Sequence, residues 1–181
     1  MQSEELVVLV DNNNNPIGTA EKDTVHTTDT PLHRAFSLFI FNSHNQVLLT
    51  KRASSKNSFP GVWTNTVCGH LAPEETPVAA ATRRLQEELG IDGVTITDLA
   101  PYRYRFADQN GIVENEICPI VIGYFDGDPK PNPEEADEWK WMGWDEFLLD
   151  IERNPAPYSP WSRQEAEIVR KKLPRKDSET H

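Results

Sequence analysis

A charged helix is the feature that most constrains what this 181-residue chain can fold into. From Thr76 to Leu89 the apolar residues return at the helical period and gather on one side. Arg84, Glu87 and Glu88 share a second arc, about 100° wide, on another side of the same helix. Because the apolar side must pack against a core, the charged arc can face a binding site.

Length and composition favour one domain that acts on a small molecule. A chain of this length can bury a sizeable core alone, so we expect a single domain over residues 1–181. Its catalytic core should span about residues 30–165, and the tail at 174–181, which lacks apolar periodicity, should fray. The net charge of −11 disfavours a nucleic-acid partner and requires any phosphate site to be a local basic pocket.

Cysteine content and the opening segment indicate a cytoplasmic protein. The 2 cysteines, in a chain with no secretory leader, are expected to be reduced thiols. The opening MQSEELVVLV is acidic, and its apolar run is too short for a membrane segment. Every apolar stripe has a role in the core, so we expect a monomer.

The periodicities predict an α/β (α+β) protein with one mixed sheet between helical layers. Two strands should form a hairpin around the SHNQ turn, and an Asn-Gly turn should lead into one long strand ending at Tyr124. Strands are expected at 6–10, 35–41, 47–51, 94–99, 102–106, 112–124 and 139–144, and helices at 76–89, 145–153 and 161–172.

Paired carboxylates occur in the segment GIVENEICP. The two-residue period of a strand places Glu114 and Glu116 on one face and turns Asn115 away. Such a pair is either an acid/base device or half of a metal site, because like charges this close must be neutralised. A solvated sheet face is the alternative, which the apolar residues that follow make less favourable.

Histidines near these carboxylates could complete a metal site. His26 and His33 flank a polar loop, and His70 follows Cys68 by two positions. One histidine alone is more often a bystander, as we expect for His44 and His181. Three imidazoles with two carboxylates exceed a four-coordinate structural zinc site and suit manganese, magnesium or expanded zinc.

The charged helix and the loop before it resemble the signature of the Nudix superfamily, Gly-x5-Glu-x7-Arg-Glu-apolar-x-Glu-Glu-x-Gly-apolar. Arg84 stands where the signature has a glutamate that, in Nudix hydrolases, helps to hold metal and activate water. An arginine there removes this base and can bind a diphosphate. The resemblance implies a Nudix-type mixed β-sheet sandwiched between α-helices. The matching positions are Gly69, Glu75, Arg83, Leu85, Glu87, Glu88, Gly90 and Ile91.

Over nearly its whole length the chain resembles the type I isopentenyl-diphosphate isomerases, a metal-dependent, flavin-free class built on the Nudix fold. The most specific stretches are TNTVCGH and GIVENEICP, supported by AEKDTVHTTDTPLHRAF, YRYRF and PYSPW. The resemblance implies interconversion of isopentenyl and dimethylallyl diphosphate in isoprenoid biosynthesis, with Cys68 and Glu116 on either side of the allylic carbons. It also implies Mg²⁺ on the substrate diphosphate, bound through Glu88 and the main chain at Cys68. A second metal, Mn²⁺, Mg²⁺ or Zn²⁺, is implied at His26, His33, His70, Glu114 and Glu116.

The chemistry of the implied reaction agrees with these residue types. A proton is added at one carbon and another is removed two bonds away, so an acid and a base must bracket the substrate. The tertiary carbocation between these steps needs a dry, aromatic pocket. We expect Trp161 to face the cation, a contact that can reach about 2 kcal/mol, and Tyr104 to hydrogen bond Glu116. A core anchor for Trp161 and a small buried apolar residue for Cys68 are the alternatives, and which of Cys68 and Glu116 gives the first proton stays open.

Binding of the diphosphate is assigned by the same resemblance to basic residues, with help from magnesium. A routine helix pair between Arg84 and Glu88 is compatible with that role. The alternative enzyme is a Nudix hydrolase of a nucleoside diphosphate derivative, which Arg84 argues against. A non-catalytic protein on a decayed Nudix scaffold is the other alternative, although Cys68, Glu116 and the histidines are all retained. The basic residues are Lys22, Arg52, Lys56 and Arg84.

Overall fold

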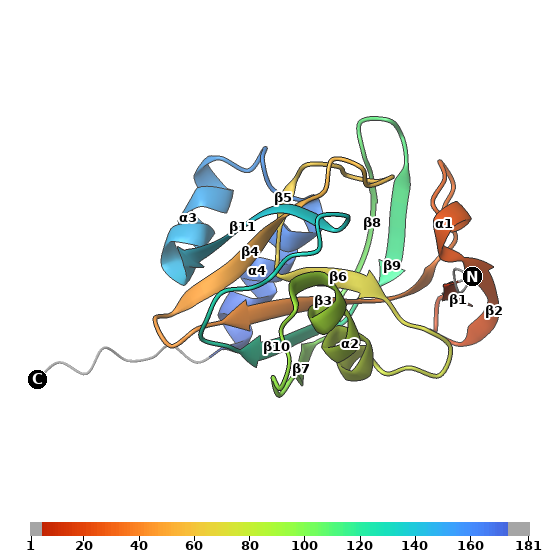
Figure 1. The fold of residues 1–181 in the computed structure, drawn as a ribbon. Coiled ribbons are helices and arrows are strands. Elements are labelled where there is room, and N and C mark those ends of the chain that lie inside the picture. The colour runs from red at the N-terminus through yellow and green to blue at the C-terminus, as the bar shows by residue number, and fades with distance from the viewer. Residues whose placement is uncertain (1–4, 174–181) are drawn as a thin grey trace, which may run out of the picture.

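The computed structural model describes residues 5–173, which form a large sheet flanked by helices (Figure 1). The helices are α1 (Lys22–Val25), α2 (Pro77–Leu89), α3 (Trp144–Arg153) and α4 (Pro160–Lys172). The strands are β1 (Leu6–Val10), β2 (Pro16–Glu21), β3 (His33–Phe41), β4 (Gln46–Arg52), β5 (Trp63–Thr64), β6 (Val67–His70), β7 (Thr97–Ala100), β8 (Arg103–Ala107), β9 (Val113–Ile117), β10 (Ile120–Tyr124) and β11 (Ala136–Gly143).

Strand β3 is the centre of the molecule because both of its faces are buried. Successive strand residues point to opposite faces, so Phe36 and Leu38 pack on one side with the apolar stripe of α2. Phe39 and Phe41 pack on the other side with α3 and α4. The predicted sheet between helical layers is therefore confirmed, with α2 on one face and α3 and α4 on the other (Figure 1).

The pairing of β3 makes the sheet mixed and brings distant segments to one place. β3 runs antiparallel to β1, β4 and β6 and parallel to β9 and β10. At its first residues, His33 lies beside Glu116 of β9, and Ala35 lies beside His70 of β6. Ser37 lies beside Cys68 of β6. The start of β3 is therefore where the predicted site residues meet.

Most predicted elements are present, with ends shifted by up to three residues. The hairpin of β3 and β4 and the Asn-Gly turn between β8 and β9 are confirmed, and Gly111 has the positive φ of 79° that such a turn favours. Thr76 caps α2 through its side-chain oxygen rather than opening the helix. The sequence reading missed β2, α1, β5 and β6, which are short or lie in polar segments.

The prediction of one strand from Ile112 to Tyr124 is wrong, because the chain breaks at Cys118 and Pro119 into β9 and β10. Proline has no N–H for a ladder and restricts the residue before it. The Cys118 N–H donates to the Tyr102 carbonyl at 2.9 Å, and the Pro119 carbonyl accepts from Ser37 N–H at 3.0 Å. As a result β9 pairs with β8 and the start of β3, whereas β10 pairs with β7 and the end of β3.

Two remaining expectations concern the ends of the chain and membranes. The tail expected to fray, with His181, lies outside the described residues. Among residues 5–173, the helices are all too short or too polar to cross a membrane.

Candidate functional site

A pocket of about 230 Å³ opens beside the start of β3 and gathers the predicted site residues from segments far apart in the chain. Its walls come from α1, the end of β4 and the loop after it, strands β6, β8 and β9, helix α2, the loop before β11 and the start of α4. His33 is the one predicted site residue that is not on the wall, and it lies behind it against Glu116. The predicted residues on the wall are Lys22, His26, Arg52, Lys56, Cys68, His70, Arg84, Glu88, Tyr104, Glu114, Glu116 and Trp161.

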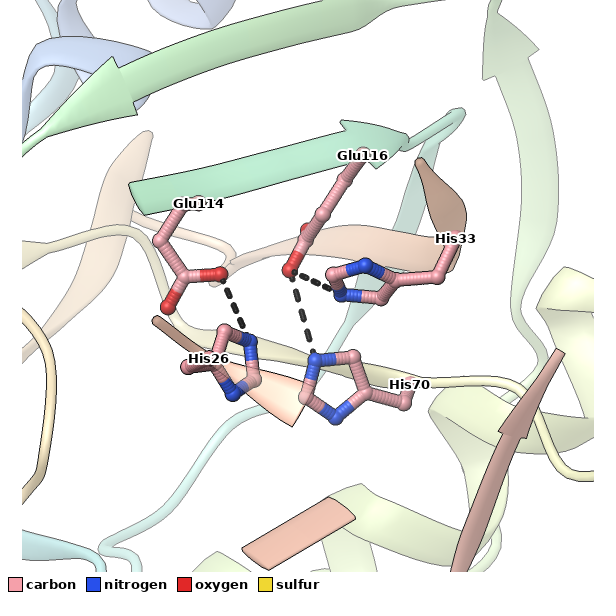
Figure 2. Close-up of side chains that lie close together, drawn as sticks. All are labelled: His26, His33, His70, Glu114 and Glu116. Carbon is pink, nitrogen blue, oxygen red and sulfur yellow. Dashed lines mark ion pairs between the residues drawn. The ribbon is translucent and has the colours of Figure 1, made fainter. Parts of the chain in front are cut away.

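Three imidazoles and two carboxylates converge at the buried side of the pocket (Figure 2). One ligand atom from each of His26, His33, His70, Glu114 and Glu116 lies within 4.8 Å of all the others. His26 Nε2 is 3.1 Å from Glu114 Oε2, while His33 Nε2 and His70 Nε2 are each 3.4 Å from Glu116 Oε1. The arrangement is a mixed nitrogen and oxygen set of the kind that holds a divalent metal.

Unsatisfied polar atoms in this cluster fit a metal ion. His26 Nε2, His33 Nε2 and Glu114 Oε2 are buried and lack hydrogen-bond partners among the described residues. Buried polar atoms are costly unless paired or bound to metal. His33 Nδ1 bonds the Pro31 carbonyl at 2.9 Å, which fixes its ring and leaves Nε2 free for the centre. The five residues therefore have the chemistry and placement of a metal centre.

Proton affinities in the cluster follow burial and the shared Glu116 carboxylate. Burial alone raises the pKa of Glu116, but the close contacts with the His33 and His70 imidazoles outweigh it and hold the pKa well below its usual range. Burial lowers the pKa of His70 to about 4, although Glu116 opposes this shift. For His33 burial also lowers the pKa, yet contact with Glu116 prevails and raises it. A carboxylate and a neutral imidazole are the forms that bind metal.

Aromatic side chains form the wall next to Glu116. The Tyr104 hydroxyl donates to Glu116 Oε2 at 2.8 Å, as expected from the sequence. The Trp161 ring stacks on Tyr104 with centroids 5.5 Å apart and meets Phe59 edge-on at 5.0 Å. Trp161 is 1% exposed, so it is both a core anchor at the start of α4 and a lining residue of the pocket. Buried aromatic rings therefore line this end of the pocket.

Cys68 faces the pocket from β6 and is held by buried polar groups behind it. Its thiol donates to Asn65 Oδ1 at 3.0 Å, and its sulfur lies 3.4 Å from Ser37 Oγ. Burial raises the pKa of the Cys68 thiol to about 12, and the Glu165 carboxyl adds to the rise. Cys68 is therefore a neutral thiol at ordinary pH, which can donate a proton, and is not a thiolate at rest.

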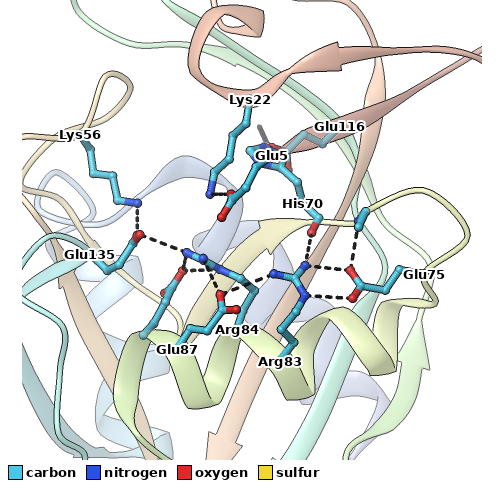
Figure 3. A network of polar contacts seen from close by, with 12 residues as sticks. Glu5, Lys22, Lys56, His70, Glu75, Arg83, Arg84, Glu87, Glu116 and Glu135 are labelled. Atoms are coloured by element: carbon cyan, nitrogen blue, oxygen red, sulfur yellow. Dashed lines mark hydrogen bonds and ion pairs between the residues drawn. The ribbon is translucent and has the colours of Figure 1, made fainter. Parts of the chain in front are cut away.

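The opposite end of the pocket carries basic residues that are paired with carboxylates (Figure 3). Lys22 Nζ bonds Glu5 Oε2 at 2.7 Å, and Lys56 bonds Glu135. Arg84, on α2, donates to Glu88 Oε1 at 3.1 Å and lies 3.2 Å from Glu135 Oε1. Lys22 and Lys56 are partly exposed and can exchange partners, whereas Arg84 is buried.

Arg84 and Glu88 form the helix pair expected as the routine interpretation, and both also line the pocket. Burial lowers the pKa of Arg84, but Glu88 and Glu135 outweigh it and raise the pKa, so the guanidinium stays charged. Burial raises the pKa of Glu88 and the Arg84 charge opposes the rise. Glu87 is not on the pocket wall, and its Oε2 accepts from Arg84 Nη1 at 2.9 Å.

Arg52 links the two ends of the pocket. Its guanidinium donates to the Ser58 carbonyl at 2.9 Å and lies 5.7 Å from the centre of the Trp161 ring. A guanidinium over an aromatic face is a favourable contact. Its Nε is buried and has no hydrogen-bond partner among residues 5–173. The side chain is held in place while retaining unused donors.

Several residues at or near the site were not anticipated, and three of them contact the predicted residues through charge or hydrogen bonds. Glu135 belongs to the acidic, Pro-rich loop, whose composition gave no sign that one carboxylate points into the pocket. Ser58 donates to Glu114 Oε1 and so supports the metal cluster. Glu165 lies on α4 behind Cys68, and only its helical phase after Trp161 could have suggested that it points inward.

The comparisons with known proteins agree on one family. A family model described as NUDIX domain matches residues 31–162. An isopentenyl-diphosphate Delta-isomerase from Saccharopolyspora erythraea is 48% identical over 167 residues, covering 91% of this chain and 86% of the relative. Proteins of the same name from Paenarthrobacter aurescens and Citrobacter koseri are 47% and 44% identical, covering 89% and 87% of this chain and 88% and 87% of theirs.

Solved structures share the fold at lower sequence identity. A protein from Deinococcus radiodurans superimposes with a TM-score of 0.72 and 21% identity, covering 94% of this chain and 100% of that one. A MutT protein from Methanosarcina mazei gives a TM-score of 0.65 at 21% identity, covering 78% and 95%. At such identities the likeness concerns the fold alone.

Proposed function

The chain belongs to the Nudix family and, within it, to the isopentenyl-diphosphate Delta-isomerases, and on that premise we propose how its pocket divides the work of isomerisation. The reaction interconverts isopentenyl and dimethylallyl diphosphate and belongs to isoprenoid biosynthesis. The proposal rests on one observation: a single pocket has a basic end and an aromatic end. One end holds basic residues, and the other holds Cys68, Tyr104, Glu116 and Trp161 among buried aromatic rings.

The basic end binds the diphosphate. Lys22, Arg52, Lys56 and Arg84 all line the pocket, and three of them are paired with carboxylates that a diphosphate can replace. Arg84 offers a planar donor fork suited to phosphate oxygens. Arg84 occupies the position of a Nudix glutamate, so it binds the diphosphate where a hydrolase has a base. This substitution is what makes the hydrolase alternative unfavourable.

The aromatic end carries out the proton transfers. Cys68 and Glu116 serve as the two groups that give and take protons at the allylic carbons. Tyr104 fixes Glu116 through Oε2, leaving Oε1 toward the histidines. Trp161 faces the carbocation and excludes water, which would otherwise capture it. The neutral thiol of Cys68 and the carboxylate of Glu116 begin with unlike proton content, as an acid and a base must.

The metal cluster supports this end. A divalent cation, Mn²⁺, Mg²⁺ or Zn²⁺, would be held by His26, His33, His70, Glu114 and Glu116. Such an ion would stabilise charge on Glu116 and lower its proton affinity. Glu88, whose Oε1 bonds Arg84, is proposed to contribute to Mg²⁺ bound with the substrate diphosphate, together with the main chain at Cys68. No flavin is part of the proposal.

We further propose that the enzyme acts as a single-domain monomer in the cytoplasm, on a small diphosphate and without nucleic acid or membrane. Both cysteines are free thiols, which supports a reducing compartment. The net charge of −11 supports a small substrate held by a local basic patch rather than a polyanion.

The metal proposal is tested by the metal content of variants. His26→Ala should lower the stoichiometry of bound Zn²⁺ or Mn²⁺ after equilibrium dialysis, since it removes a ligand. His44→Ala is the matched control, because His44 lies in the turn between β3 and β4 and should leave metal content unchanged. Equal metal content in both variants would remove the cluster from its proposed role.

The activity is tested with isopentenyl diphosphate, Mg²⁺ and Mn²⁺. The allylic product breaks down in acid through a stabilised cation, whereas the substrate does not, so acid-labile material measures isomerisation. We expect such material to form without release of inorganic phosphate before acid treatment. Phosphate release from nucleoside diphosphate derivatives, without an acid-labile product from isopentenyl diphosphate, would favour the hydrolase instead.

A further inference from the structure

A carboxyl group without a charged partner is buried behind Cys68. Glu165, on α4, is 0% exposed, and it is not on the wall of the pocket. Neither of its oxygens has a hydrogen-bond partner among the described residues. An isolated buried carboxylate is very costly, so such a group normally takes up a proton. Nothing in the proposed chemistry uses Glu165.

The Ser37 hydroxyl, which lies close to Glu165, belongs to a buried hydrogen-bond network that holds the Cys68 thiol. Asn65 Nδ2 donates to Ser37 Oγ at 2.9 Å, and the Cys68 thiol donates to Asn65 Oδ1 at 3.0 Å. Ser37 Oγ and Cys68 Sγ are 3.4 Å apart, and either atom can be the donor. These contacts therefore do not determine whether the Ser37 hydroxyl donates its hydrogen to Cys68 Sγ or accepts one from it.

The surroundings of Glu165 favour its protonated form. Burial raises the pKa of the Glu165 carboxyl well above its usual value, and the Glu116 carboxylate adds to the rise. The Ser37 hydroxyl is close enough to oppose this shift, and no cation is among the groups that act on it. The other titratable groups that sense Glu165 are Cys68, Tyr102 and Cys118, which are neutral at ordinary pH because burial raises the pKa of each.

We propose that Glu165 is a positioning residue that acts on Cys68 through Ser37, as a neutral carboxylic acid donating its hydrogen to Ser37 Oγ. The terminal torsion of a glutamate is soft, so a small rotation aligns the two groups. Ser37 Oγ then accepts from both Asn65 and Glu165, which uses both of its lone pairs. Its own hydrogen is left for Cys68 Sγ. An ionised Glu165 would take that hydrogen away from the sulfur.

The consequence is a fixed thiol at the edge of the substrate site. The Ser37 hydroxyl serves the sulfur as a donor whether Cys68 carries its proton or not, so the orientation of the side chain holds through the reaction. A misplaced reacting group costs rate rather than binding. This inference rests on the proposed function for its rate effect, but the protonation of Glu165 does not.

The kinetic test compares two substitutions at one position. Glu165→Gln keeps a neutral donor of the same shape, so kcat should stay within about twofold of wild type. Glu165→Leu keeps the volume but removes the donor, so kcat should fall at least about tenfold while KM stays within about twofold. Glu167→Gln is the matched control on the exposed side of α4, where Glu167 pairs with Arg170, and should change neither constant.

Two kinetic results contradict the proposal. One is full kcat in folded Glu165→Leu, and the other is a loss in Glu165→Gln as large as in Glu165→Leu, which would mean that an ionisable group is needed. If Glu165→Leu does not fold, Ser37→Ala tests the same contact from its other side. It should lower kcat at least about tenfold at unchanged KM, and an unchanged kcat overturns the proposal.

An infrared measurement tests the neutral acid without any activity. At neutral pH, the difference spectrum of wild type minus Glu165→Gln should contain the C=O band of a protonated carboxyl group. Wild type minus Glu167→Gln should lack that band, because Glu167 is exposed and its pKa is lowered by Arg170. A carboxylate band in its place for Glu165 contradicts the inference, whereas a protein that shows the protonated band but no isomerisation contradicts only the proposed function.

Discussion

The two ends of the pocket are held together by different kinds of interaction. At the diphosphate end, Lys56, Arg84 and Glu135 form ion pairs along the pocket wall, where Lys56 keeps partial exposure and Arg84 is buried. At the chemical end, Tyr104 and Trp161 are buried in stacked contacts, and Cys68 is held by uncharged donors and acceptors. The first end can exchange partners without disturbing the core, whereas the second cannot move without repacking it.

This difference matches the demands of the reaction. Ion pairs in contact with solvent, such as that of Lys22 with Glu5, contribute little stability, so a diphosphate can replace such carboxylates at small cost. Arg84 is buried, but its guanidinium stays charged and lines the pocket. Proton transfers and a carbocation need groups held to within a fraction of an ångström and kept from water. Substitutions at the diphosphate end should therefore change KM, and those at the chemical end should change kcat.

The largest effect is expected from the two proton-transfer residues. Cys68→Ala and Glu116→Gln each remove a group that gives or takes a proton, and such groups contribute about 10²- to 10⁴-fold in rate. The kcat of each variant should fall by at least about 10²-fold with little change in KM, measured as acid-labile product.

Folding and metal content must be unchanged for this result to bear on the roles. Cys118→Ala is the matched control for Cys68→Ala, because Cys118 is buried off the pocket wall and should leave kcat nearly intact. Full activity in either Cys68→Ala or Glu116→Gln would remove that residue from the chemical end.

The next effect concerns stability and the neutral state of Glu165. Because its pKa is raised in the folded protein, the stability it contributes is full below the unfolded value of 4.5 and is lost as pH rises toward the raised pKa. As pH rises from 5 to 7, the unfolding free energy of Glu165→Gln should therefore increase relative to that of wild type. Urea unfolding of both proteins at pH 5 and pH 7 measures this difference. An equal change in unfolding free energy between the two pH values for wild type and Glu165→Gln would contradict it.

A smaller effect is expected from the aromatic face. Trp161→Leu removes a cation–π contact worth about 2 kcal/mol, so kcat should fall about 30-fold while KM changes little. Trp141→Leu is the control, since Trp141 packs on the α2 side of the sheet, away from the pocket. Equal kcat values for the two folded variants would exclude Trp161 from contact with the carbocation.

The smallest effect is expected at the diphosphate end. Glu135→Gln removes a carboxylate that competes with diphosphate for Lys56 and Arg84, a gain of about 1 kcal/mol, so KM should fall about fivefold at unchanged kcat. Glu138→Gln is the control, because Glu138 pairs with Lys51 outside the pocket at 3.1 Å. A raised KM in Glu135→Gln would show that this carboxylate helps substrate binding, which contradicts the view that a diphosphate replaces it.

The sequence predicted the two ends unequally. Spacing placed Glu114 and Glu116 on one strand face and Arg84 with Glu88 on one helix arc, because those relations are local. The meeting of His33, His70 and Glu116 depends on the registers of β6 and β9 against β3, which no local pattern contains. The motif resemblance identified the residues that come together here, and the structure gives their geometry.

Other residues were missed for physical reasons. Glu135 sits in a loop whose acidic composition is typical of a solvated segment, so only tertiary contacts reveal its pairing with Lys56. Glu165 looks like an ordinary polar helix residue until its burial is known. The break before β10 could have been found, since Pro119 argues against a continuous central strand.

The central claim is that this pocket moves a double bond by proton transfer. The most direct measurement is NMR of isopentenyl diphosphate in deuterated water with Mg²⁺ and the wild-type enzyme. The account predicts dimethylallyl diphosphate carrying deuterium on its carbon chain, with both phosphates still attached. An unchanged substrate, or product without deuterium from a metal-loaded and folded enzyme, would contradict it.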